Sequence, residues 1–152
     1  MPLAGDEPIL AIGTAAGERN AKLSPDGRWL AYVSDESGRF EIYIQPLPAT
    51  GARWQISRSG GLQPQWRGDG SELYFIAPDK KLMAAEIKVE GSGLIPGEPA
   101  ALVETRITGL QQLPHGCQYC VGTDGKRFLV VTPTDTVTPV TVVLNWEALP
   151  GR

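Results

Sequence analysis

The residues best suited to chemistry lie in one short segment, His115-Gly116-Cys117-Gln118-Tyr119-Cys120, which holds the only histidine and both cysteines of the chain. A Cys-x-x-Cys pair beside a histidine is typical of metal sites and thiol redox centres. If Cys117 to Val121 is a strand, however, this spacing places the thiols on opposite faces and about 10 Å apart, too far for a disulfide. A structural zinc site needs four ligands, and one chain has no second Cys/His pair.

We therefore expect Cys117 and Cys120 to be buried or half-buried free thiols, and we expect no cofactor. A metal or redox role for His115, Cys117 and Cys120 is the alternative, because the clusters of two chains can meet in a dimer.

Other catalytic arrangements have little support. The sequence has no Gly-x-Ser-x-Gly elbow, and Ser92 is typical of a glycine-rich loop. Asp26, Asp69 and Asp124 each precede a glycine, a pair that favours tight turns, and they recur too far apart to form one site. The chain is not expected to be an enzyme.

The elements around these residues repeat along the chain. Asp-Gly pairs begin at residues 26, 69 and 124, and aligned apolar residues flank each pair at the same distances (Leu23/Leu30, Trp66/Leu73, Val121/Phe128). A period of about 40 to 45 residues with four short strands is typical of a propeller blade, and loops at 91–99 and 107–116 lengthen the second interval. The pattern predicts one all-β domain over residues 1–152, with three four-stranded blades at about 20–57, 63–105 and 115–146.

The best-kept repeat runs Leu23-Ser24-Pro25-Asp26-Gly27-Arg28-Trp29-Leu30-Ala31-Tyr32-Val33-Ser34-Asp35 and continues with Glu41-Ile42-Tyr43-Ile44. It resembles the WD-like β-propeller repeat of TolB and its relatives. The second copy keeps Trp66 and Asp69-Gly70, and the third keeps little beyond residues 124–128. The ending Thr141 to Trp146 is similar to propeller segments attached to bacterial serine/threonine kinases. The resemblance implies a β-propeller with a scaffold-type role.

Three blades do not readily close a ring, because propellers have four to eight. We expect two copies to form a six-bladed homodimeric ring, in which the strand at residues 8–12 of one copy completes the last blade of the other. The residues expected at this contact are Ile9, Leu10, Ile12, Val140, Val142, Leu144 and Trp146. Trp54, on a mixed outer strand, is a further candidate contact residue, whereas Trp29 and Trp66 are expected in the core.

The expected function is a non-catalytic module for protein–protein interaction or ligand sensing, with an unidentified protein or small ligand as partner. The alternative is a fragment of a longer chain that supplies the missing blades. It would then be an accessory propeller of a larger enzyme, either a kinase sensor tail or the gating domain of a prolyl-oligopeptidase-type peptidase.

Composition and net charge exclude some classes of binding partner. The net charge of −3 and pI near 5.2, with no basic cluster larger than Lys80-Lys81, give no footprint for nucleic acid. No stretch reaches the roughly 20 apolar residues of a membrane span, and the N-terminus lacks the features of a signal peptide. Cytoplasmic and periplasmic locations both remain open.

Overall fold

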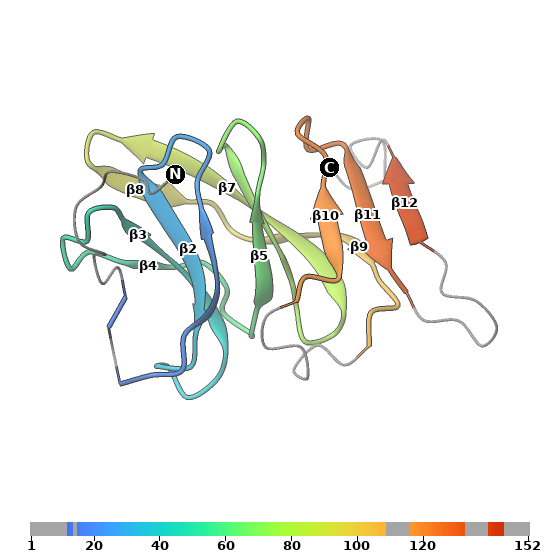
Figure 1. The fold of residues 1–152 in the computed structure, drawn as a ribbon, viewed down its shortest axis with the longest axis horizontal. Coiled ribbons are helices and arrows are strands. Elements are labelled where there is room, and N and C mark those ends of the chain that lie inside the picture. Colours follow the sequence, from blue (N-terminus) through green and yellow to red (C-terminus); the bar gives the residue numbers. More distant parts are fainter. Residues whose placement is uncertain (1–11, 14, 109–115, 133–139, 145–152) are drawn as a thin grey trace, which may run out of the picture.

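The computed structural model describes residues 12–13, 15–108, 116–132 and 140–144, and every regular element in this part of the chain is a β-strand. The strands form three antiparallel sheets that lie side by side (Figure 1). The all-β prediction is confirmed. No described segment is a helix of the length and apolar character that crossing a membrane requires.

The first sheet has the order β1-β2-β3-β4, with bounds Arg19–Leu23, Trp29–Ser34, Glu41–Pro46 and Trp54–Gln55. The second sheet has the order β5-β6-β7, with both β8 and β9 pairing to β7; the bounds are Leu62–Trp66, Glu72–Ile76, Lys81–Glu90, Gly93–Pro96 and Ala100–Glu104. The third sheet has the order β10-β11-β12, with bounds Tyr119–Val121, Arg127–Val131 and Val140–Leu144.

The three Asp-Gly pairs form equivalent turns, as predicted. Gly27, Gly70 and Gly125 have φ of 73°, 77° and 69°, a conformation that glycine adopts without strain. In each turn the glycine N–H donates to the carbonyl three residues earlier, and the preceding aspartate accepts from the backbone N–H two residues after itself. Each turn therefore joins the first and second strands of its sheet at the same place in the repeat.

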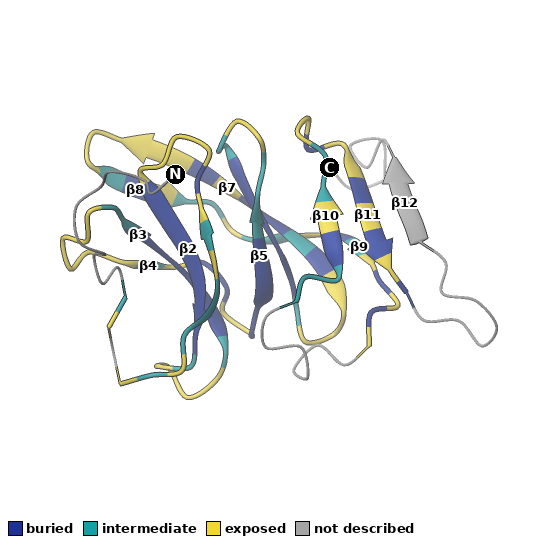
Figure 2. Ribbon diagram, in the orientation of Figure 1, coloured by how far each residue is buried: buried dark blue, intermediate teal, exposed yellow. Residues whose placement is uncertain are grey.

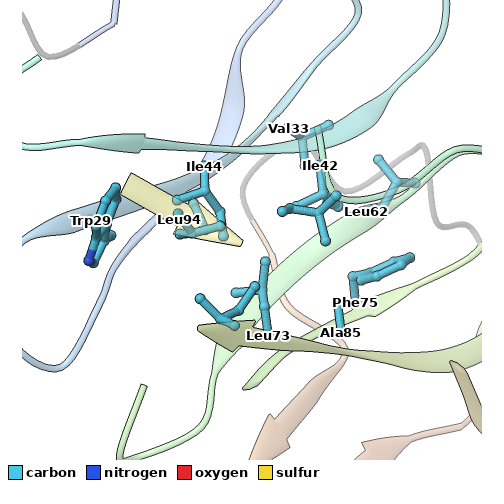
Figure 3. Close-up of a cluster of buried hydrophobic side chains, with 12 residues drawn as sticks. Trp29, Val33, Ile42, Ile44, Leu62, Leu73, Phe75, Ala85 and Leu94 are labelled. Atoms are coloured by element: carbon cyan, nitrogen blue, oxygen red, sulfur yellow. The ribbon is translucent and has the colours of Figure 1, made fainter. Parts of the chain in front are cut away.

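The second sheet is buried on both faces, because its side chains alternate between two hydrophobic clusters. Leu73 and Phe75 on β6 pack with Trp29, Val33 and other residues of the first sheet (Figure 3). The alternate β6 residues Tyr74 and Ile76 pack instead with the third sheet, where they meet Tyr119, Phe128 and Val130. The sheets thus stack face to face in chain order.

Some elements differ from the sequence prediction. The predicted connection at 91–99 contains β8, which forms a hairpin with the far half of β7. This hairpin forms because Gly91 turns the chain at a φ of 60° and Leu94 is buried. The strand predicted at Arg53 to Ser57 is only Trp54–Gln55, and β10 begins at Tyr119 instead of Cys117.

Candidate functional site

The cysteine segment lies at the start of the third sheet. Cys117 precedes β10 and is half-buried, whereas Cys120 lies within β10 and is exposed; both are free thiols. The prediction of burial is wrong for Cys120, because the face of β10 opposite the buried Tyr119 has no described sheet packed on it. Among the described residues no three His, Cys, Asp or Glu side chains gather in a way that would hold a metal ion, and His115 lies outside those residues.

The tryptophans are placed largely as predicted. Trp29 is buried, and Trp66 is partly buried against the same hydrophobic cluster. Trp54 is half-buried, and its ring meets that of Trp29 edge to face with the centroids 5.7 Å apart. Trp54 therefore serves the packing of the first sheet, with only part of its surface open to a partner.

Two glutamine side chains connect β5 of the second sheet with the segment just before β10 of the third. The backbone N–H of Gln118 donates to Gln63 Oε1 at 2.7 Å, and Gln63 Nε2 donates to Gln118 Oε1 at 3.1 Å. The Tyr119 hydroxyl donates to the Gln63 carbonyl at 2.8 Å. Gln63 has a φ of 58° and sits where β5 shifts its register against β6, so the bulge turns this residue toward the next sheet.

Burial around this link affects Tyr119 most. Its ring is 1% exposed, and burial raises the pKa of its phenol well above 10. The hydroxyl thus remains a neutral donor to the Gln63 carbonyl at physiological pH. Sequence reasoning missed the link, although an amide recurs at this repeat position as Asn20, Gln63 and Gln118.

A second polar cluster lies at the rim between the same two sheets. The Tyr74 hydroxyl donates to Glu72 Oε2 at 2.6 Å, and Arg67 Nη1 lies 3.2 Å from the same carboxylate oxygen. The hydroxyl also lies 3.4 Å from the Gly125 carbonyl of the third sheet's turn. This contact fixes the Asp124-Gly125 turn against the second sheet.

An open hollow of about 520 Å³ adjoins this rim, and its acidic side chains include Glu72, Glu86 and Glu98. Each of these carboxylates has an ion-pair partner: Arg67 for Glu72, Lys88 for Glu86 and Arg58 for Glu98. The hollow is therefore close to charge-balanced and has the character of a polar contact surface.

Glu41 is a buried charge that the sequence reading missed. Its side chain is fully buried and accepts hydrogen bonds from the Ser57 hydroxyl and from the Gly60 N–H at 2.9 and 3.0 Å. Arg39 Nε pairs with it at 2.6 Å. A buried carboxylate satisfied in this way is a structural clamp, here on the segment that leads from the first sheet to the second.

The residues predicted at the contact between copies are only partly described. Val140, Val142 and Leu144 lie on β12, opposite Val131, Leu129 and Arg127 in register, and β12 ends the strand order of the third sheet. Ile12 is half-buried and lies in no strand. Ile9, Leu10 and Trp146 lie outside the described residues.

Comparison with known proteins adds information about the fold. No protein-family model matches the sequence, and no curated protein matches it. Solved structures do match. A protein provisionally identified as TolB from Agrobacterium tumefaciens has a TM-score of 0.57 at 14% identity, covering 90% of this chain and 48% of that one. Oligogalacturonate lyase from Vibrio parahaemolyticus has a TM-score of 0.56 at 14% identity, covering 92% of this chain and 34% of that one.

A protein provisionally identified as a 6-phosphogluconolactonase from Bacteroides uniformis has a TM-score of 0.50 at 16% identity, with 84% of this chain and 36% of that chain covered. This chain therefore spans between about a third and a half of the length of these structures. At such identities the likeness concerns the fold alone. The chain has the propeller-type fold of the TolB-like β-propeller proteins, as its repeat implied.

Proposed function

We propose that this chain is a non-catalytic β-propeller module for protein interaction or ligand sensing, and that two copies close a six-bladed ring. The observation that carries the proposal is the comparison with the TolB structure, which aligns with 90% of this chain but with only 48% of its own length. The three sheets of the described residues are too few for a ring of four to eight blades, whereas two sets of three fit that range.

The matching structures include a lyase and a lactonase as well as TolB, so the proposal of a non-catalytic role rests on how the carboxylates of this chain are engaged. Glu72, Glu86 and Glu98 at the rim hollow are engaged in ion pairs, and Glu41 is a buried clamp. Groups held in this way are suited to supporting a binding rim, and a partner would bind at that rim or in the central channel.

We place the proposed contact between the copies at the third sheet. Its described strands are three, and β12 ends their order, whereas the first sheet has a fourth strand in the corresponding place. In the proposed ring, residues 8–12 of each copy would add a strand beside β12 of the other. Exchange of an identical element between protomers is a low-cost route to a dimer, and it protects a strand edge that would otherwise promote aggregation.

Light scattering coupled to size exclusion at micromolar concentration tests the ring. The intact chain is expected to elute as a dimer of twice 16.3 kDa, and deletion of residues 1–12 is expected to release monomers. A compact monomer for both proteins would refute the ring.

The alternative is an accessory propeller of a larger enzyme, in which further blades of the same polypeptide complete the ring. The 34% share of the lyase structure favours it as much as the dimer. On this alternative the isolated chain is expected to be monomeric or to associate without a fixed stoichiometry, and the same light-scattering measurement separates the two.

A further inference from the structure

Large hydrophobic side chains are exposed at five described positions: Leu23, Val89, Ile95, Leu129 and Val131. Val89 and Ile95 lie on the β7–β8 hairpin, which has no counterpart among the described residues of the other two repeats. The other three occupy positions that recur in every repeat, so their counterparts show what such a position normally contacts.

Leu129 and Val131 lie on β11, and each is 42% exposed. Exposed and buried residues alternate along this strand (Figure 2). Counted from the aspartate of each Asp-Gly turn, their counterparts in the first and second sheets are all 0% exposed: Ala31, Val33, Tyr74 and Ile76. Those counterparts are buried because the next sheet in chain order packs on them. Leu129 and Val131 therefore form the same kind of surface with no described sheet on it.

Leu23 occupies the repeat position that packs on the preceding sheet. It is 55% exposed, while its counterparts Trp66 and Val121 pack against the hydrophobic cluster shared with the preceding sheet. Trp66 Nε1 donates to the Lys22 carbonyl of the preceding sheet at 3.0 Å, and β5, which carries Trp66, contacts both β1 and β2. The repeat position of Lys22 is occupied in the third sheet by Cys120.

From the exposed Leu23 of β1 and the exposed Leu129 and Val131 of β11, we infer that β1 of a second copy lies over β10 and β11, with its Leu23 beside Cys120 and against Leu129 and Val131. This inference rests on the proposed dimeric ring and specifies which surfaces form it. In the proposed ring the sheet that follows the third sheet is the first sheet of the second copy, and β1 of that copy lies over β10 and β11 as β5 lies over β1 and β2.

The contact is concentrated on β1, since other residues on that face of the first sheet are already buried within one chain. Leu30 is 9% exposed, Tyr32 1% and Tyr43 4%. In the proposed ring two such contacts, related by a two-fold axis, would bury Leu23, Leu129 and Val131 of both copies.

Substitution at exposed positions tests the surfaces without disturbing the folded chain. Leu129→Lys and Leu23→Lys are each expected to weaken dimerisation by at least about tenfold, because a charge replaces a buried apolar contact. Val89→Lys is the matched control, since Val89 is 43% exposed and lies outside the repeat positions. Sedimentation velocity over a concentration series gives the dissociation constants, and circular dichroism confirms folding of each variant.

Cross-linking tests the pairing itself. In a Cys117→Ser background, Leu23→Cys places a thiol predicted to lie beside Cys120 of the other copy, so a short bis-maleimide is expected to join the chains covalently. Val89→Cys in the same background is expected to yield no such product.

The outcomes separate this inference from the proposed function. If the parent protein is dimeric but Leu23→Lys and Leu129→Lys dimerise with the same affinity, the assigned surfaces are wrong while the proposed ring stands. The same conclusion follows if the chains cross-link only through position 89. A parent protein that is monomeric at every concentration would overturn both.

Discussion

Gly27, Gly70 and Gly125 allow one substitution to be compared in three copies of the same turn. Alanine at a φ near +70° costs about 1 kcal/mol at each position. At Gly27 the added Cβ would meet nothing within 4 Å, and at Gly70 its nearest contact would be Pro25 at 3.8 Å. At Gly125 it would lie 2.6 Å from the Tyr74 hydroxyl, a separation that forces the ring or the turn to move.

The additional loss at Gly125 follows from what the Tyr74 hydroxyl does. The side chain is fully buried, and its hydroxyl donates to Glu72 at 2.6 Å, so displacement costs about 1–3 kcal/mol on top of the backbone strain. Gly125→Ala is therefore expected to lower the free energy of unfolding by about 2–4 kcal/mol, and Gly27→Ala and Gly70→Ala by about 1 kcal/mol each.

Urea unfolding followed by tryptophan fluorescence at one fixed protein concentration measures the three losses. Adding Tyr74→Phe to Gly125→Ala removes the hydroxyl that obstructs the Cβ, so the combined loss is expected to be smaller than the sum of the two single losses. If Gly125→Ala and Gly27→Ala differed by less than about 0.5 kcal/mol, the described packing of the third turn on the second sheet would be refuted.

Three further substitutions test other parts of the structure. Glu41→Gln weakens the charge-assisted hydrogen bond from Ser57 and is expected to cost about 1–3 kcal/mol in urea unfolding; a loss near zero would argue against the clamp. Burial raises the pKa of Tyr119, so the folded chain keeps a proton that the unfolded chain releases near pH 10. The stability that the neutral phenol contributes is therefore present below about pH 10 and falls as the pH rises. Tyr119→Phe is expected to flatten the decline in the urea midpoint between about pH 9 and 11. Leu73→Ala, at a fully buried site, is expected to cost about 2–5 kcal/mol, whereas Leu129→Ala in the monomer is expected to cost less than about 1 kcal/mol by the same assay; similar losses would contradict the assigned burial.

Much of the fold could be predicted because its signals are local. The unbroken run of apolar residues from Trp29 to Val33 indicates a strand covered on both faces, and the structure buries all five residues. The candidate site was less predictable. Cys120 is exposed because no described sheet covers its face of β10, a fact that residue spacing cannot reveal. The link between Gln63 and Gln118 depends on a register shift in β5, which the one-dimensional pattern does not show.

The sequence by itself determined the turns and the repeat, because an Asp-Gly pair encodes its own backbone geometry within a few residues. Only the tertiary structure decided what each repeated position contacts. Gly27 and Gly125 have nearly the same φ, yet only Gly125 lies against a tyrosine of another sheet. Leu129 and its counterpart Tyr74 have the same place in the repeat, but Tyr74 is covered by a following sheet and Leu129 is not. The conformation of these turns is set by neighbours in sequence, whereas the burial of each repeated position is set by neighbours in space.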